Sequence, residues 1–279
     1  MKEIKKTFQQ HFLKVLVLSL VFTSAIARNN DTALPNHKKT FVLVHGAWQS
    51  SFVWNEVKQK LEKQGHRVIA VELQAHGQDQ SPIADATLEN YVTKVKTAIN
   101  SVDGKVILVG HSLGGAIITQ TATQLPNKIE KLVYIAGFVP PSGKSVNDLS
   151  KQDSAPEIKL ELLVFAKDYT TVTFANPEVN VPYIFCNDGS KQQKAQLVKS
   201  LKPEPTAPMA TPLAYDSSVF AGLDKYYIYT TQDHAISYGF QQQMVKEAGI
   251  TNTFALDASH SPFLSKPTEL AKILQNLTK

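Results

Sequence analysis

The sequence predicts an α/β fold in which a mostly parallel sheet carries helices on both faces. Two patterns lead to this prediction. Short, continuous apolar runs alternate with segments of helical periodicity, and the apolar runs lack the polar alternation of a sheet with one wet face. The 279 residues are 43% hydrophobic and 19% charged, which is ordinary for a globular protein and excludes a disordered or collagen-like chain.

The first half of the chain contains four apolar runs of strand length. The expected strands are 40–44, 67–71, 105–109 and 131–136. Helical patterns follow, because Val53, Trp54, Val57 and Leu61 recur at three- and four-residue spacing and a second such series spans 87–99. Strands that alternate with helices in this way pair in parallel, since each helix returns the chain to the same edge of the sheet.

The pattern changes at about residue 138. Between 138 and 222 the periodicity is weak, and nine of the chain's 14 prolines lie there. Such a segment is too long for a simple loop, so we expect a cap inserted into one domain of residues 40–279. The alternation then resumes with a strand at 225–230, a helix near 236–248, a strand at 251–256 and a final helix at about 267–277.

Residues 1–27 have the pattern of a secretory signal peptide. Four lysines precede the apolar run 15–22, and the segment ends in Ala25-Ile26-Ala27. The run is shorter than the roughly 20 residues that span a bilayer. We expect cleavage after Ala27, a polar linker at 28–39, no membrane anchor after cleavage, and a secreted or periplasmic protein. The alternative is an amphipathic start that stays uncleaved.

Charge and cysteine content exclude several classes of partner. The formal charge of +5 falls to +2 when the four lysines and one glutamate of residues 1–27 are removed. Arg28 and Arg67 are the only arginines, so the Arg-rich stripe typical of nucleic-acid binding is missing. Cys186 is the only cysteine, which rules out an intramolecular disulfide and a cysteine-based metal site.

A G-x-S-x-G motif follows the apolar run 105–109 and precedes a helix. It consists of Gly110-His111-Ser112-Leu113-Gly114. A serine on such a sharp turn needs small neighbours two residues away and is exposed at the carboxyl end of its strand. The Leu113 N–H then lies at a helix N-terminus, where it can stabilise an anionic oxygen. Ser112 is therefore the predicted nucleophile, and a glycine-rich turn without function is the alternative.

A serine nucleophile needs a base and an acid that orients the base. His260 follows the last expected strand. With a G-x-S-x-G serine on a strand-to-helix turn, the three residues follow in the order serine, acid, histidine, so the acid lies between Ser112 and His260. Asp233 comes just after the strand at 225–230, so it is the predicted acid. Asp257 is a second candidate, although its place three residues before His260 suits it better to bracing that turn. Asp224 precedes its strand and so belongs to the wrong end of the sheet.

The turn after the first strand is the expected source of a second oxyanion donor. Gly46 permits a close backbone approach, and the Ala47 N–H would complete the pair with Leu113. We expect His45 to hold this loop by hydrogen bonds. No metal is predicted, since His45, His76 and His111 lie on separate loops and no H-E-x-x-H motif occurs.

Residues 41–48, with Trp54, and 110–115 resemble the α/β-hydrolase superfamily. Within it they are similar to the branch of plant methylesterases, hydroxynitrile lyases and related bacterial esterases, which 231–233 and 257–264 also fit. The resemblance covers about residues 40–278. It implies the α/β-hydrolase fold, a Ser112–His260–Asp233 triad, an oxyanion hole from Ala47 and Leu113, and a cap over the site.

One departure from this branch bears on the reaction. Its hydroxynitrile lyases carry a lysine directly after the catalytic histidine, where this chain has Ser261. We therefore expect a serine esterase that cleaves small-molecule esters with small or aromatic apolar groups through an acyl-enzyme, without a cofactor. A lyase or C–C hydrolase with the same triad, and a non-catalytic binding protein on this scaffold, are the alternatives.

Overall fold

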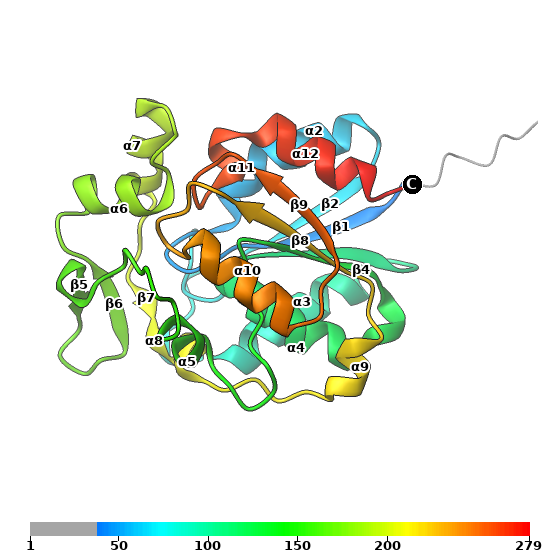
Figure 1. Ribbon diagram of the computed structural model, residues 1–279, viewed down its shortest axis with the longest axis horizontal. Helices are drawn as coiled ribbons and strands as arrows, with labels where there is room; N and C mark the ends of the chain where they lie inside the picture. Colours follow the sequence, from blue (N-terminus) through cyan, green and yellow to red (C-terminus); the bar gives the residue numbers. More distant parts are fainter. Residues whose placement is uncertain (1–37) are drawn as a thin grey trace, which may run out of the picture. The chain divides into compact units, whose positions relative to one another are not determined.

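The computed structural model describes residues 38–279. The predicted signal peptide and all but the last two residues of the predicted linker lie outside these residues. Six parallel strands form the central sheet, in the order β2-β1-β3-β4-β8-β9 (Figure 1). Their bounds are β1 Thr40–Val44, β2 Arg67–Val71, β3 Val106–His111, β4 Ile129–Ile135, β8 Lys225–Thr230 and β9 Asn252–Leu256.

Both faces of this sheet are covered by helices, as the continuous apolar runs predicted. In β1, Phe41 and Leu43 pack into one hydrophobic cluster, while Val42 and Val44 pack into the other. The first cluster includes α2 Asn55–Lys63, α11 Pro262–Ser265 and α12 Pro267–Asn276. The second includes α3 Leu88–Asn100, α4 Leu113–Gln124 and α10 Tyr238–Glu247. Short 3-10 helices are η1 Ser51–Trp54, η2 Ile83–Asp85 and η3 Pro126–Lys128.

Between β4 and β8 the chain leaves the sheet and builds the cap (Figure 1, left). The cap contains a small antiparallel sheet of β5 Leu163–Phe165, β6 Thr171–Phe174 and β7 Glu204–Pro205. Its helices are α5 Val146–Ser150, η4 Leu160–Leu162, α6 Pro177–Phe185, α7 Lys191–Lys199 and α8 Thr206–Ala210. These strands have two to four residues, too few for a period to be visible in the sequence.

The last part of the inserted segment returns to the core. Helix α9, Ser217–Ala221, contacts α4 on the second face of the sheet (Figure 1). The part of the insertion that stands apart from the core therefore ends before α9. In residues 38–279 no helix is both long and apolar enough to cross a membrane.

Candidate active site

Ser112 lies on a strained turn between β3 and α4. Its backbone has φ 52° and ψ −122°, values that L-residues with a side chain rarely adopt. A Cβ added to Gly110 would lie 2.5 Å from the Gly114 carbonyl oxygen, and one added to Gly114 would lie 2.8 Å from the His45 carbonyl oxygen. The turn thus requires glycine at both positions, for the steric reason expected from the motif.

His260 and Asp233 meet at the carboxyl edge of the sheet. Their side chains come from the loops after β9 and β8, and His260 Nδ1 lies 2.8 Å from Asp233 Oδ2. Both side chains are almost completely buried. His260 Nε2 is also buried and has no hydrogen-bond partner among the described residues. This unpaired nitrogen is the atom that a general base would use.

The carboxylate of Asp233 is fixed by several donors besides His260. Oδ1 accepts hydrogen bonds from the backbone N–H groups of Ala235 and Ile236, each at 2.8 Å. Oδ2 accepts from Thr230 Oγ1 at 2.7 Å and from Gln241 Nε2 at 3.1 Å. These bonds hold one rotamer, which leaves Oδ2 aimed at His260.

The other aspartates have different partners. Asp257 accepts hydrogen bonds from Thr231 Oγ1 at 3.1 Å and Gln232 Nε2 at 3.0 Å, and so braces the loop after β8. Asp224 lies before β8 and pairs with Lys131 at 3.0 Å. The structure therefore brings Asp233 to His260 and keeps the two rival carboxylates in other contacts.

His111 is a site residue that the sequence did not reveal. Its Nε2 donates to the backbone carbonyl of His260 at 2.8 Å, and the two rings lie 4.5 Å apart. Burial, followed by the nearby His260, holds the pKa of His111 well below its ordinary value, so this ring is neutral. No spacing rule predicts this contact, because the two residues are 149 positions apart.

The loop after β1 approaches Ser112 closely. A Cβ on Gly46 would lie 2.6 Å from Ser112 Cβ, so only glycine fits there. Ala47 and Leu113 lie beside Ser112 in the lining of one cavity. His45 braces the loop as expected, since its Nδ1 lies 2.9 Å from the Gly46 carbonyl oxygen and its Nε2 accepts from the Leu73 N–H at 3.3 Å.

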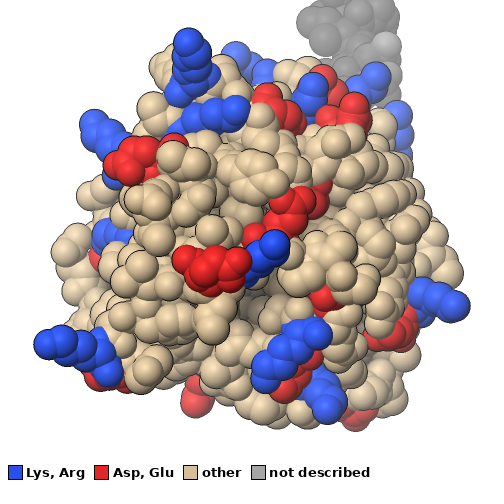
Figure 2. Space-filling model, turned by 60° about the vertical axis from the view of Figure 1, so that its left-hand side comes forward, with Lys and Arg blue, Asp and Glu red and all other residues tan. Residues whose placement is uncertain are grey.

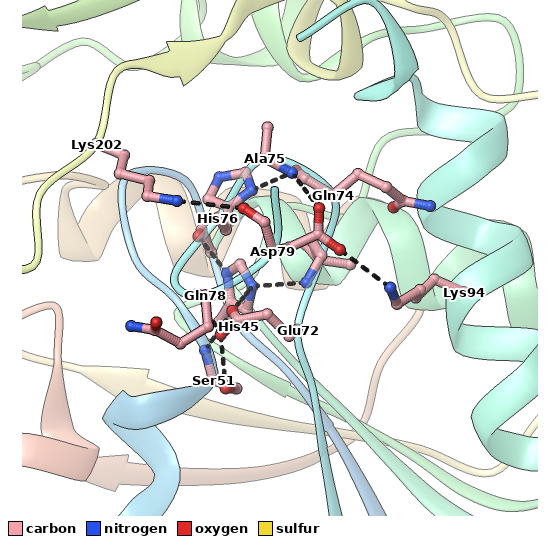
Figure 3. A network of polar contacts seen from close by, with 12 residues as sticks. His45, Ser51, Glu72, Gln74, Ala75, His76, Gln78, Asp79, Lys94 and Lys202 are labelled. Carbon is pink, nitrogen blue, oxygen red and sulfur yellow. Dashed lines mark hydrogen bonds and ion pairs between the residues drawn. The ribbon is translucent and has the colours of Figure 1, made fainter. Parts of the chain in front are cut away.

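Burial, together with the charge of His76, lowers the pKa of His45 to about 3. His45 is therefore neutral in the network that Figure 3 shows, where it lies next to Glu72. A neutral imidazole that is already engaged on both nitrogens is a structural brace and has no free atom for proton transfer.

A cavity of about 470 Å³ opens beside Ser112. Its walls are mainly apolar and come from both the core and the cap, and they include Trp48, Phe138, Leu163, Phe165, Phe185, Met209 and Phe240. Of the large apolar residues of the cap, Leu163, Phe165 and Phe185 line the cavity, whereas Leu162, Phe174, Tyr183 and Ile184 do not. On the cap side of the molecule acidic and basic side chains are interspersed (Figure 2).

Within residues 38–279 no group of three or more His, Cys, Asp or Glu side chains is arranged to hold a metal ion. The site brings together a serine at a helix N-terminus, a histidine oriented by a carboxylate and an apolar cavity.

Known proteins share the fold of this chain. Residues 41–273 match the profile of the alpha/beta hydrolase family. The chain belongs to the alpha/beta hydrolase family. It is 31% identical over 253 residues to methylesterase 7 of Arabidopsis thaliana. The aligned region covers 86% of this chain and 96% of that relative. The predicted fold class and the predicted likeness to the methylesterase branch are confirmed.

Solved structures of other alpha/beta hydrolases superimpose on the chain. A pyrethroid hydrolase from Sphingobium faniae is 25% identical with a TM-score of 0.78, covering 86% of this chain and 96% of that one. An extracellular alpha/beta-hydrolase from a Paenibacillus species is 28% identical with a TM-score of 0.72. The superposition covers 85% of this chain and 98% of that one. The predicted enzyme class, a carboxylic ester hydrolase, is confirmed by the named esterases among these relatives.

Proposed function

We propose that this protein is an exported serine esterase that cleaves esters with small or aromatic apolar groups through an acyl-enzyme on Ser112. One observation carries the proposal. The Asp233 carboxylate orients His260 through Nδ1 and leaves Nε2 buried and unpaired, and the His260 backbone is bonded to His111, the residue before Ser112, which lines an apolar cavity.

The proposed reaction has two halves. His260 Nε2 takes the proton of Ser112 as Oγ attacks the ester carbonyl carbon, and the Ala47 and Leu113 N–H groups stabilise the resulting oxyanion. The histidine then gives the proton to the leaving alcohol. Water attacks the acyl-enzyme by the same route, releases the acid and restores Ser112.

The cavity supports the proposed substrate class. Its aromatic side chains form a predominantly apolar surface that suits an aromatic or short aliphatic group better than a charged one. The relatives named above as a methylesterase and a pyrethroid hydrolase are enzymes whose names denote ester substrates. An ester whose alcohol or acid part is small and apolar is therefore the proposed substrate.

Labelling with a fluorophosphonate, which modifies activated serines, tests the proposed nucleophile. We expect wild-type protein to be labelled and Ser112→Ala to be unlabelled. A panel of p-nitrophenyl esters from acetate to decanoate should show turnover that is highest for the short esters. Wild-type protein that binds these esters without labelling or turnover would instead be a binding protein on this scaffold.

The lyase alternative is tested with mandelonitrile. The position after His260 holds Ser261, a buried residue whose Oγ accepts from Gln49 Nε2 at 2.8 Å, and it supplies no cation to hold departing cyanide. We expect cyanide release at the background rate. Cyanide release well above background, with p-nitrophenyl butyrate left intact, would replace the esterase proposal with a lyase.

Export is tested separately from catalysis. N-terminal sequencing of the protein from its native host is expected to give a chain that begins at Arg28. A chain in the cytoplasmic fraction that begins at Met1 would contradict export and leave the esterase proposal standing.

A further inference from the structure

A buried carboxylate of the cap reaches the loop that carries the proposed oxyanion donor. Glu204 of β7 is fully buried, and its Oε2 accepts a hydrogen bond from the Trp48 N–H at 2.5 Å. The same oxygen lies 2.9 Å from His76 Nε2. Trp48 directly follows Ala47, so this contact is made one peptide bond away from the donor.

Trp48 has a backbone conformation that needs outside support. Its φ is 57°, in the left-handed region, which is strained for a bulky residue. Its indole Nε1 donates to the Val172 carbonyl at 3.0 Å, and its ring packs 5.0 Å from that of Phe174. With Glu204, these contacts all come from the cap, so the cap holds the loop in its strained form.

The geometry around His76 favours its charged form. Nδ1 lies 2.9 Å from the Gln74 carbonyl oxygen, and Nε2 faces Glu204. A neutral imidazole has only one N–H, whereas both nitrogens here face oxygen acceptors. Although burial opposes the charge, Glu204 raises the pKa of His76 above its ordinary value. A charged His76 in turn gives the buried carboxylate of Glu204 a partner of opposite charge.

The surroundings of His76 contain few competing charges. The Tyr91 hydroxyl lies 3.4 Å from Nδ1, and Glu72 adds a weaker attraction. The His45 ring is 5.0 Å away and neutral. Figure 3 shows His76 on the loop after β2, together with a second cap residue, Lys202, whose Nζ donates to the Asp79 carbonyl at 3.3 Å.

We propose that Glu204 is a positioning residue for the oxyanion hole. Paired with charged His76, it fixes the Trp48 N–H and with it the peptide that follows Ala47, so the Ala47 N–H points at the oxygen of the tetrahedral intermediate. The position of the cap then determines the orientation of the Ala47 N–H. This inference rests on the proposed esterase function.

Steady-state kinetics on p-nitrophenyl butyrate test the inference with three variants. Glu204→Met keeps the length of the side chain but removes the acceptor, and its kcat is expected to fall about 10²-fold with KM nearly unchanged. Glu204→Gln keeps an oxygen that can accept from Trp48 and should retain most of kcat. Lys202→Met removes a neighbouring cap contact that does not involve Trp48, and its kcat should equal that of wild type.

A second readout separates alignment from loose packing. A trifluoromethyl ketone forms an adduct with serine whose oxyanion occupies the hole, so its affinity for Glu204→Met should fall in proportion to kcat/KM. A wild-type kcat in Glu204→Met, or an equal loss in Lys202→Met, would overturn the inference. In both of these outcomes the wild-type protein still shows turnover that depends on Ser112, so the esterase proposal stands. Wild-type protein with no such turnover would overturn the esterase proposal and this inference together.

If Glu204→Met does not fold, nuclear magnetic resonance of wild-type protein labelled with ¹⁵N-histidine and ¹⁵N-tryptophan decides the matter. We expect both nitrogens of His76 to carry protons at neutral pH, and the Trp48 amide proton to be shifted strongly downfield by the carboxylate. A neutral His76 together with an ordinary Trp48 amide shift would overturn the inference.

Discussion

The core wall and the cap wall of the site are built differently. On the core side, Asp233 and His260 are buried, and the Asp233 carboxylate accepts five hydrogen bonds. In the cap, six of the seven exposed large hydrophobic residues in the described part of the chain fall between 160 and 183, and two of them, Phe165 and Tyr169, line the cavity. The difference teaches that proton transfer needs groups held in one position, whereas apolar substrates are recognised by a surface of adaptable side chains.

A few polar contacts connect these walls. Besides Glu204, Asp153 of the cap accepts from the Ser237 backbone N–H at 2.9 Å and from its hydroxyl at 2.6 Å. Ser237 caps the N-terminus of α10, the helix that also carries Gln241 against Asp233. The cap is thus tied to the core beside both the acid and the oxyanion loop, so its seating can affect catalysis without a cap residue taking part in the chemistry.

Removal of the nucleophile or the base is the strongest test of the core wall. Ser112→Ala and His260→Ala should each lower kcat by about 10⁴-fold or more, because members of a triad act as a unit. The double variant should lose little beyond either single one. Turnover of p-nitrophenyl butyrate measures the effect, and losses that add in the double variant would contradict a shared role.

Exchange of the acid separates the catalytic contact from the structural one. Asp233→Asn should lower kcat by about 10³-fold or more, since the amide cannot stabilise charged His260. Asp257→Asn is the matched control and should stay near wild type, because its two hydrogen bonds only brace an exposed loop. An inactive Asp257→Asn beside an active Asp233→Asn would reverse the assignment of the acid.

Changes in the cap wall should alter selectivity more than rate. Phe165 lines the cavity, so Phe165→Ala should raise the ratio of kcat/KM for p-nitrophenyl octanoate to that for acetate by about 10-fold. Val179→Ala is the control, because Val179 is 68% exposed and does not line the cavity. Equal ratios in the two variants would show that this wall does not select the acyl chain.

The smallest expected effect is on the pH dependence of stability. Since the folded pKa of His76 is raised above 6.5, its pairing with Glu204 contributes full stability below that pH. The contribution is lost as pH rises through the folded pKa. Urea unfolding should show the difference between wild type and His76→Asn shrinking over that range. A parallel course of the two curves would mean that His76 is already neutral when folded.

Much of the site could be predicted because its signals are local. Ser112 is identified by glycines two residues away, and each of His260 and Asp233 follows directly after a strand of a parallel sheet. The choice of Asp233 over Asp257 also had a local basis, the position of each relative to its strand end. Distances and hydrogen-bond partners could not be predicted in this way, because they depend on which loops meet at the edge.

The inserted segment was harder to predict. Its position after β4 was visible as a loss of periodicity and an excess of proline. Its small sheet was not, because β7 has only two residues and pairs with a strand about 30 positions earlier. The expected strand at 131–136 in turn begins at Ile129 and ends at Ile135, an ordinary uncertainty at element ends.

The sequence by itself determined the parallel sheet, the strained turn at Ser112 and the chain order of the three polar residues. These follow from apolar runs and from the small residues that a sharp turn requires, both of which are properties of neighbouring positions. The tertiary structure alone decided that His111 would hold the backbone of His260, and that Glu204 would reach Trp48 across 156 positions. Buried polar groups must find partners wherever the fold places them, and no local pattern records which partner that will be.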